Sequence, residues 1–136
     1  MPKSDRFPAE VVEMLRSAKI LGVRAGSSHK FTGVWPVVVD GRLFARSWSD
    51  KPTGWFQAFR AERTGAIQFA HVELDVRARI VRGDRLRDAV TRAFAEKYPT
   101  KGSRKWVEGF AEPARAANTI EFIPRAAAGV RRLVTR

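Results

Sequence analysis

Hydrophobic positions along this chain follow two spacings, and each spacing predicts its own kind of secondary structure. Apolar residues three and four positions apart, the period of a helix with one buried face, predict helices over 8–18 and 84–97. A shorter helix with an aromatic buried face is expected over 53–63, with Asp50 or Thr53 as its N-terminal cap. The segment 101–112 has an ambiguous pattern, in which a turn of helix would present Trp106 and Phe110.

Runs of β-forming residues predict strands over 23–25, 34–39, 42–48, 66–69, 73–80 and 119–123. Two of these strands flank Asp40-Gly41, a dipeptide typical of a two-residue hairpin with a type I′ turn. This turn sets a register with three cross-strand pairs: Val39 with Arg42, Val37 with Phe44 and Trp35 with Arg46.

Both faces of this hairpin are largely apolar, which favours strands wrapped into a barrel over a sheet with one wet face. One face is expected to carry Trp35, Val37, Phe44, Arg46 and Trp48. The order of elements predicts an α+β fold, a six-stranded antiparallel barrel with flanking helices. We expect one domain over 1–136, with its core over 7–124 and a basic C-terminal tail over 125–136.

The charge of the chain is strongly positive and unevenly spread. Its 26 Lys and Arg against 14 Asp and Glu give a net charge of +12, and residues 77–136 hold 15 basic against 6 acidic residues. Such a half would attract phosphate, carboxylate or nucleic acid; the alternative is arginine distributed over solvated faces. Because the basic cluster Arg131-Arg132 with Arg136 is too short for a nucleic-acid arm, nucleic acid is not the expected partner.

The composition also excludes several classes of protein. The chain has no cysteine, which excludes disulfide scaffolds, thiol nucleophiles and thiolate metal sites. Its two histidines are far apart, so no metal-ligand spacing is present and no metal is expected. No apolar run approaches the roughly 20 residues that span a bilayer, and the first residues show no secretory pattern. A cytoplasmic protein without a membrane partner is therefore expected.

The segment from Arg46 to Trp55 holds the best candidate for a binding site. A strand is expected to end here and a helix to begin, and basic and hydroxyl side chains at such a junction suit a phosphate. Arg46 and Lys51 would supply charge and Ser47 a hydroxyl, while Trp48 and Trp55 would offer flat walls to a planar ring. The alternative is an ordinary capped helix with two core tryptophans.

No catalytic residue can be assigned from the sequence. In the polar loop before the hairpin, His29 has the chemistry of a general acid or base and Lys30 could reach a second anion; the alternative is a solvated loop. Nucleophile, Walker and dinucleotide motifs are missing. If the protein is an enzyme, a bound organic cofactor is expected to perform the chemistry.

The run from Trp35 to Trp48, followed by Lys51 and Gly54-Trp55, resembles a small bacterial family of unknown function. Further matches are Glu96-Lys97-Tyr98, Lys101-Gly102-Ser103, Gly109-Phe110 and the segment 119–124, so that the resemblance covers about residues 7–124. More distantly, the hairpin followed by a helix is similar to the flavin-binding split barrels. That superfamily includes pyridoxamine-phosphate oxidases, flavin reductases and deazaflavin-dependent nitroreductases.

This resemblance implies a six-stranded split barrel, a homodimer, and FMN or a deazaflavin coenzyme bound at the dimer interface. It places the phosphate on Arg46, Ser47 and Lys51, and the ring along 34–37, which includes Trp35 and Val37. The implied activity is an oxidoreductase acting on a small planar substrate. Two alternatives stay open: a non-enzymatic module that binds a small ligand or a polyanion such as nucleic acid, and a split barrel without a cofactor.

Overall fold

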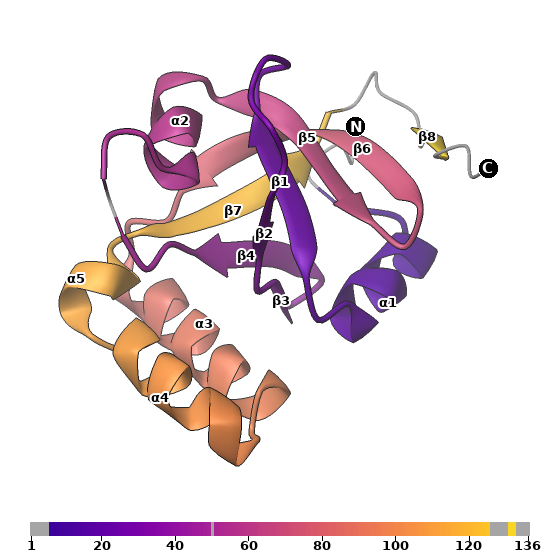
Figure 1. Ribbon diagram of the computed structural model, residues 1–136. Helices are drawn as coiled ribbons and strands as arrows, with labels where there is room; N and C mark the ends of the chain where they lie inside the picture. The colour runs from indigo at the N-terminus through magenta and orange to yellow at the C-terminus, as the bar shows by residue number, and fades with distance from the viewer. Residues whose placement is uncertain (1–5, 50, 126–130, 133–136) are drawn as a thin grey trace.

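The computed structural model describes residues 6–49, 51–125 and 131–132, which form a curled antiparallel sheet with flanking helices (Figure 1). The helices are α1 (Ala9–Ser17), α2 (Trp55–Ala61), α3 (Asp84–Lys97), α4 (Lys101–Phe110) and α5 (Pro113–Ala116). The strands are β1 (Leu21–Ala25), β2 (Thr32–Val34), β3 (Val37–Val39), β4 (Arg42–Arg46), β5 (Thr64–Phe69), β6 (Val72–Ile80), β7 (Thr119–Pro124) and β8 (Arg131–Arg132). Most of the tail predicted over 125–136, and the predicted cap Asp50, lie outside the described residues.

The two long amphipathic helices lie where the apolar period predicts them. Helix α1 buries Val11 and Leu15, and α3 buries Val90 and Phe94, four residues apart in each case. Helix α2 is shorter than expected and starts after Gly54, without a side-chain cap, so the capping role predicted for Thr53 is wrong. The ambiguous segment 101–112 contains the regular helix α4, whose N-terminus is capped by the Thr100 side chain.

The sheet follows the strand order β2-β1-β5-β6-β7-β4-β3, with every neighbouring pair antiparallel. Its two edge strands, β2 and β3, are consecutive in the chain and are separated only by Trp35 and Pro36. Because a two-residue link cannot cross a flat sheet of this width, the sheet must curl until its edges approach each other. The result is a half-barrel whose gap is bridged by this link.

The path has seven strands, and the two-residue β8 pairs with β6, so the expected number of six is wrong. The difference arises where one strand was expected over 34–39. Pro36 has no N–H to donate to a ladder, and the chain leaves the sheet there. The predicted pair of Trp35 with Arg46 does not form, because β3 begins at Val37 and its ladder with β4 ends at the pair of Val37 with Phe44.

The hairpin turn itself is confirmed. Asp40 and Gly41 both have positive φ, 52° and 74°, as a type I′ turn requires, and Val39 pairs with Arg42. The alternation of faces is confirmed as well. Leu43 and Ala45 point into the larger core that fills the half-barrel, whereas Phe44 points into a second core against α3.

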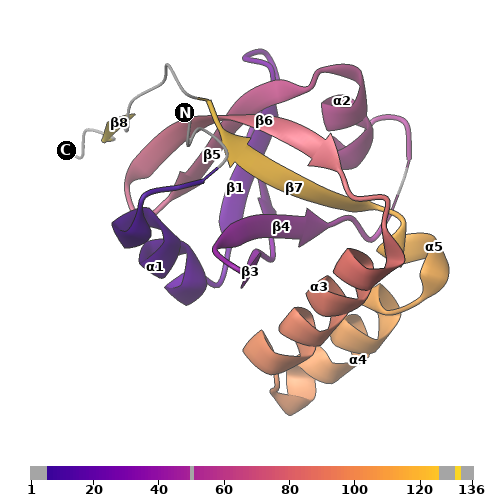
Figure 2. The ribbon, with the colours of Figure 1, turned by 180° about the vertical axis from the view of Figure 1, so that it is seen from behind.

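The helices cover different parts of the sheet. Helices α1 and α2 contribute Leu15, Phe56 and Phe59 to the core inside the half-barrel. Helix α3 packs on β3, and α4 lies beside α3 (Figure 2). The second core between these helices and the sheet includes Phe94 and Phe110, whose rings stack with centroids 5.0 Å apart. This helical layer forms one wall of the site described below.

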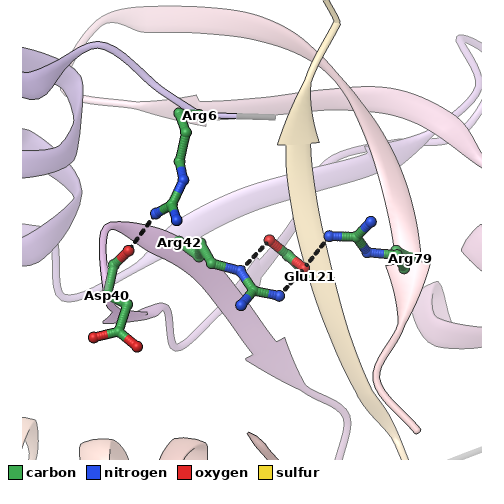
Figure 3. A network of polar contacts seen from close by, with 5 residues as sticks. All are labelled: Arg6, Asp40, Arg42, Arg79 and Glu121. Atoms are coloured by element: carbon green, nitrogen blue, oxygen red, sulfur yellow. Dashed lines mark hydrogen bonds and ion pairs between the residues drawn. The ribbon is translucent and has the colours of Figure 1, made fainter. Parts of the chain in front are cut away.

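A buried carboxylate joins three neighbouring strands on the outside of the half-barrel. Glu121 of β7 is 2% exposed and accepts two hydrogen bonds from Arg42 of β4 and one from Arg79 of β6, each 2.9 Å long (Figure 3). Burial alone would raise the pKa of Glu121, but the hydrogen bonds and positive charge of the two guanidinium groups outweigh it and lower that pKa. The carboxylate therefore stabilises the sheet in its ionised form.

We expect Glu121→Gln to lower the free energy of unfolding at pH 7 by about 1–2 kcal/mol, because charge-assisted bonds are replaced by weaker ones. The contribution of an acid with a lowered pKa is complete above its ordinary value of 4.5 and is lost as the pH falls through the folded-state value. Urea unfolding at pH values from 7 to 3 should therefore show that the difference in the free energy of unfolding between wild type and variant shrinks below pH 4.5. Glu13→Gln, at a carboxylate 74% exposed, is the control and should unfold with the same free energy as the wild type at every pH. A difference for Glu121→Gln that does not change with pH would contradict the role of the ionised carboxylate.

Candidate functional site

All four tryptophans of the chain line one open cleft of about 310 Å³. The cleft lies where the edge of the half-barrel, the start of α2 and the helix α4 meet. Besides the four indoles, it is lined by Gly33, Val34, Arg46 and Phe110. A pocket with mainly apolar, aromatic walls and a single charged group is the usual form of a site for a small organic ligand. We refer to it as the aromatic cleft.

Each tryptophan reaches the cleft from a different part of the fold. Trp35, in the link between β2 and β3, stacks on Tyr98 with ring centroids 4.2 Å apart. Trp55 is the first residue of α2, and Trp48 follows β4. Trp106 of α4 meets the Trp48 ring edge to face at 5.0 Å. Since Trp48 and Trp106 are 36% and 46% exposed, these two indoles form the rim of the cleft.

The link that carries Trp35 is held from behind. The carbonyl oxygen of Pro36 accepts hydrogen bonds from Lys97 Nζ at 2.8 Å and from the Tyr98 hydroxyl at 3.0 Å. Tyr98 is buried and Lys97 partly buried at the end of α3, and this burial lowers the pKa of Lys97 to about 8 and raises that of Tyr98. This anchoring fixes the inner wall of the cleft.

Arg46 closes the floor of the cleft, and the protein itself uses most of its donors. The side chain is 2% exposed and donates four hydrogen bonds, to Thr119 Oγ1, Thr91 Oγ1, the Phe110 carbonyl and the Arg87 carbonyl. Burial, helped by the charge of Arg87, lowers the pKa of Arg46 to about 10, which leaves it protonated at neutral pH. A guanidinium has five N–H groups, and the hydrogen bonds to described residues use four of them. One N–H group is left for a ligand.

The structure brings together some of the predicted site residues and separates others. Four of the seven line the cleft: Trp35, Arg46, Trp48 and Trp55. Val37 is buried in the second core, the Ser47 hydroxyl donates to the carbonyl oxygen of Ser49, and Lys51 is exposed outside the cleft lining.

Sequence reasoning did not assign Trp106, Phe110 or Gly33 to the site, although all three line the cleft. For Trp106 and Phe110 a signal is present: they are four residues apart, and so share one face of α4. Gly33 of the short edge strand β2 gives no comparable signal in the sequence.

Among the described residues, no group of three or more His, Cys, Asp or Glu side chains is placed to hold a metal ion. In the same part of the chain, none of the helices has both the length and the apolar character needed to cross a membrane.

An antiparallel half-barrel whose edges are bridged by a short link, with helices at its sides, is the split-barrel fold. Over residues 16–122 the sequence matches the family described as an uncharacterized protein conserved in bacteria, DUF2255, and the chain belongs to that family. The matched region includes every residue that lines the aromatic cleft.

Solved structures with this fold are similar in shape and distant in sequence. One is a putative pyridoxamine 5'-phosphate oxidase from Listeria innocua, with TM-score 0.60 and 8% identity, covering 89% of this chain and 94% of the other. The heme storage protein HutZ from Vibrio cholerae has TM-score 0.62 and 13% identity, with coverages of 93% and 94%. A FAD-binding protein from Mesorhizobium loti has TM-score 0.53 and 17% identity, with coverages of 94% and 96%. The search of curated proteins returned no match.

Proposed function

We propose that this protein binds a planar, flavin-type cofactor with its ring in the aromatic cleft, and that it acts as an oxidoreductase on a small planar substrate. The observation that carries the proposal is the convergence of all four tryptophans, from two helices and two connecting segments, on one cleft of about 310 Å³. Aromatic rings prefer stacked and edge-to-face contacts, which these walls offer to a flat heterocycle. The split-barrel structures named for FAD binding and for pyridoxamine 5'-phosphate oxidase support the choice of a flavin.

The composition of the cleft favours a flavin over heme, although one similar structure is a heme storage protein. A protein holds heme iron through an axial His, Cys, Met or Tyr side chain. None of these residue types is among the described residues that line the cleft. His29, in the β1–β2 loop, lines a neighbouring hollow and not the cleft, and His71 lies at the exposed turn between β5 and β6.

The chain's own groups would bind and orient such a ring. Trp35, held by Tyr98, and Trp55 form rigid walls, while Trp48 and Trp106 at the rim would limit the access of water. The buried positive charge of Arg46 would favour electron density on the ring edge nearest the cleft floor. When bound, the flavin supplies hydride or electron transfer. FMN and a deazaflavin share the ring shape that these walls recognise, and the homodimer expected from the resemblance stays a prediction.

The proposal is tested by titrating the protein with riboflavin, FMN and a deazaflavin while following tryptophan fluorescence. We expect saturable quenching, and we expect Trp106→Ala to weaken binding by about 1 kcal/mol, roughly fivefold, through the loss of one stacking contact. Trp106→Phe is the matched control, because it keeps a ring at the rim and should bind nearly as the wild type does. If none of the three compounds binds at high micromolar concentration, the protein is not a flavin protein of this kind.

A further inference from the structure

A second hollow, of about 210 Å³, lies next to the aromatic cleft and differs from it in character. Its polar lining comes from the β1–β2 loop, β1 and the segment before α2: Arg24, His29, Lys30, Thr32 and Thr53. We call it the basic recess. No Asp or Glu is among the described residues that line it, so its lining is cationic and hydroxylic. Such a set of donors suits an anion, whereas a single imidazole without a carboxylate or thiolate beside it is a poor set of ligands for a metal cation.

The linings of the recess and the cleft adjoin in two places. Trp55 lines both of them. Along β2, Thr32 lines the recess while the next two residues, Gly33 and Val34, line the cleft. Helix α2 packs against β1 (Figure 1), and the two hollows lie on either side of its first residue, Trp55. A ligand whose ring lies in the cleft would reach the recess by passing a side chain beside Trp55.

The donors of the recess are less occupied than those of Arg46. The guanidinium of Arg24 lies 4.4 Å above the Phe31 ring, and its ion pair with Glu73 is long at 3.8 Å. Its Nε is buried and has no hydrogen-bond partner among the described residues. A buried donor without an acceptor is costly and indicates a group that the protein alone does not supply. His29 and Lys30 are exposed and available to such a group.

We propose that the basic recess binds a phosphate or carboxylate group, and that this group is the anionic end of the ligand whose ring lies in the aromatic cleft. This assignment rests on the proposed function. It replaces the junction of Arg46, Ser47 and Lys51 as the anion site, because Arg46 and Ser47 are engaged within the protein. A cleft of about 310 Å³ lies at the lower end of the range for organic ligands, which suits a ring system without its side chain.

FMN and riboflavin test this assignment directly, because they share the ring and differ in the phosphate. We expect FMN to bind the wild type about tenfold more tightly than riboflavin, as charge-assisted hydrogen bonds require. Lys30→Met removes the charge and keeps the aliphatic stem. It should reduce FMN affinity about tenfold and leave riboflavin affinity unchanged, so that the two affinities become equal.

Two lysine variants complete the design. Lys51→Met tests the competing junction, and Lys19→Met, on an exposed site away from both hollows, controls for net charge. The assignment is overturned if FMN and riboflavin bind the wild type equally, or if Lys51→Met or Lys19→Met removes the preference for FMN as fully as Lys30→Met does. In each of these cases riboflavin binding still supports the flavin cleft.

If neither flavin binds, the proposed function fails and the recess is tested with inorganic phosphate alone. Phosphate should raise the melting temperature of the wild type above that in sodium chloride of equal ionic strength, and Lys30→Met should remove the difference. Equal melting temperatures in the two salts would overturn the recess as an anion site. The other case is that both flavins bind with equal affinity. A phosphate effect on the melting temperature would then show a site for a free anion and overturn its link to the ring ligand.

Discussion

Replacing Arg46 with methionine is expected to lower the free energy of unfolding by about 3 kcal/mol. The substitution leaves the carbonyl oxygen of Phe110 without its described side-chain donor and removes three further hydrogen bonds, to Thr91, Thr119 and the Arg87 carbonyl. A buried acceptor that loses its donor costs about 1–3 kcal/mol. The same guanidinium also connects α3, α4 and β7 through its hydrogen bonds. Urea unfolding measures the loss.

Arg92→Met on the exposed face of α3 is the matched control and should change the stability by less than about 0.5 kcal/mol. The same Arg46 variant also separates a structural from a ligand-binding role. If Arg46 holds the cleft floor, its replacement should weaken riboflavin and FMN to the same extent. A selective loss of FMN with unchanged stability would instead support the phosphate role predicted from the sequence.

Gly109→Ala is expected to lower the free energy of unfolding by about 1–3 kcal/mol and to open the rim of the aromatic cleft. An added Cβ at this position would lie within 2.6 Å of Trp48 Cζ3, and nearer still to Cη2, so the indole must turn away from α4. Trp48 also packs under the Arg115 guanidinium, 3.7 Å from the ring centroid, and that contact would be lost with it. Urea unfolding and the tryptophan emission maximum report the two effects.

The same helix offers a control with the opposite expected sign. Gly102 has nothing within 4 Å of an added Cβ, so Gly102→Ala should stabilise α4 by up to about 1 kcal/mol through helix propensity alone. The emission maximum should not move in this variant. Similar stability changes for the two alanines would show that Trp48 does not depend on a glycine beneath it.

Local chemistry predicted much of the fold. The Asp40-Gly41 turn could be predicted because the positive φ of both residues is a property of the turn itself. Helices α1 and α3 could be predicted because their period reflects one buried face. Helix α4 is ambiguous in the sequence because its two glycines weaken its helix propensity, and its packing against α3 decides the outcome.

The candidate site was only partly predictable, and the reason is distance along the chain. Trp35 and Trp48 were noted because they flank the hairpin, but Trp106 comes from a helix far along the sequence. The partners of Arg46 lie 41 to 73 residues away, so no local pattern could show that its donors are engaged. For the same reason, the sequence does not decide whether His29 and Lys30 contact an anion or form a solvated loop, and only the structure places them in one hollow with Trp55.

The order of residues by itself determined the helical and extended periods, the hairpin turn, the excess of positive charge and the supply of four indoles, because each of these depends on neighbouring residues or on composition alone. The tertiary structure decided that the chain leaves the sheet at Trp35 and Pro36, that the four indoles meet in one cleft, and that Arg46 belongs to its floor. These features depend on which distant strands and helices pack together, and that choice is made by burial of the whole core rather than by any one segment.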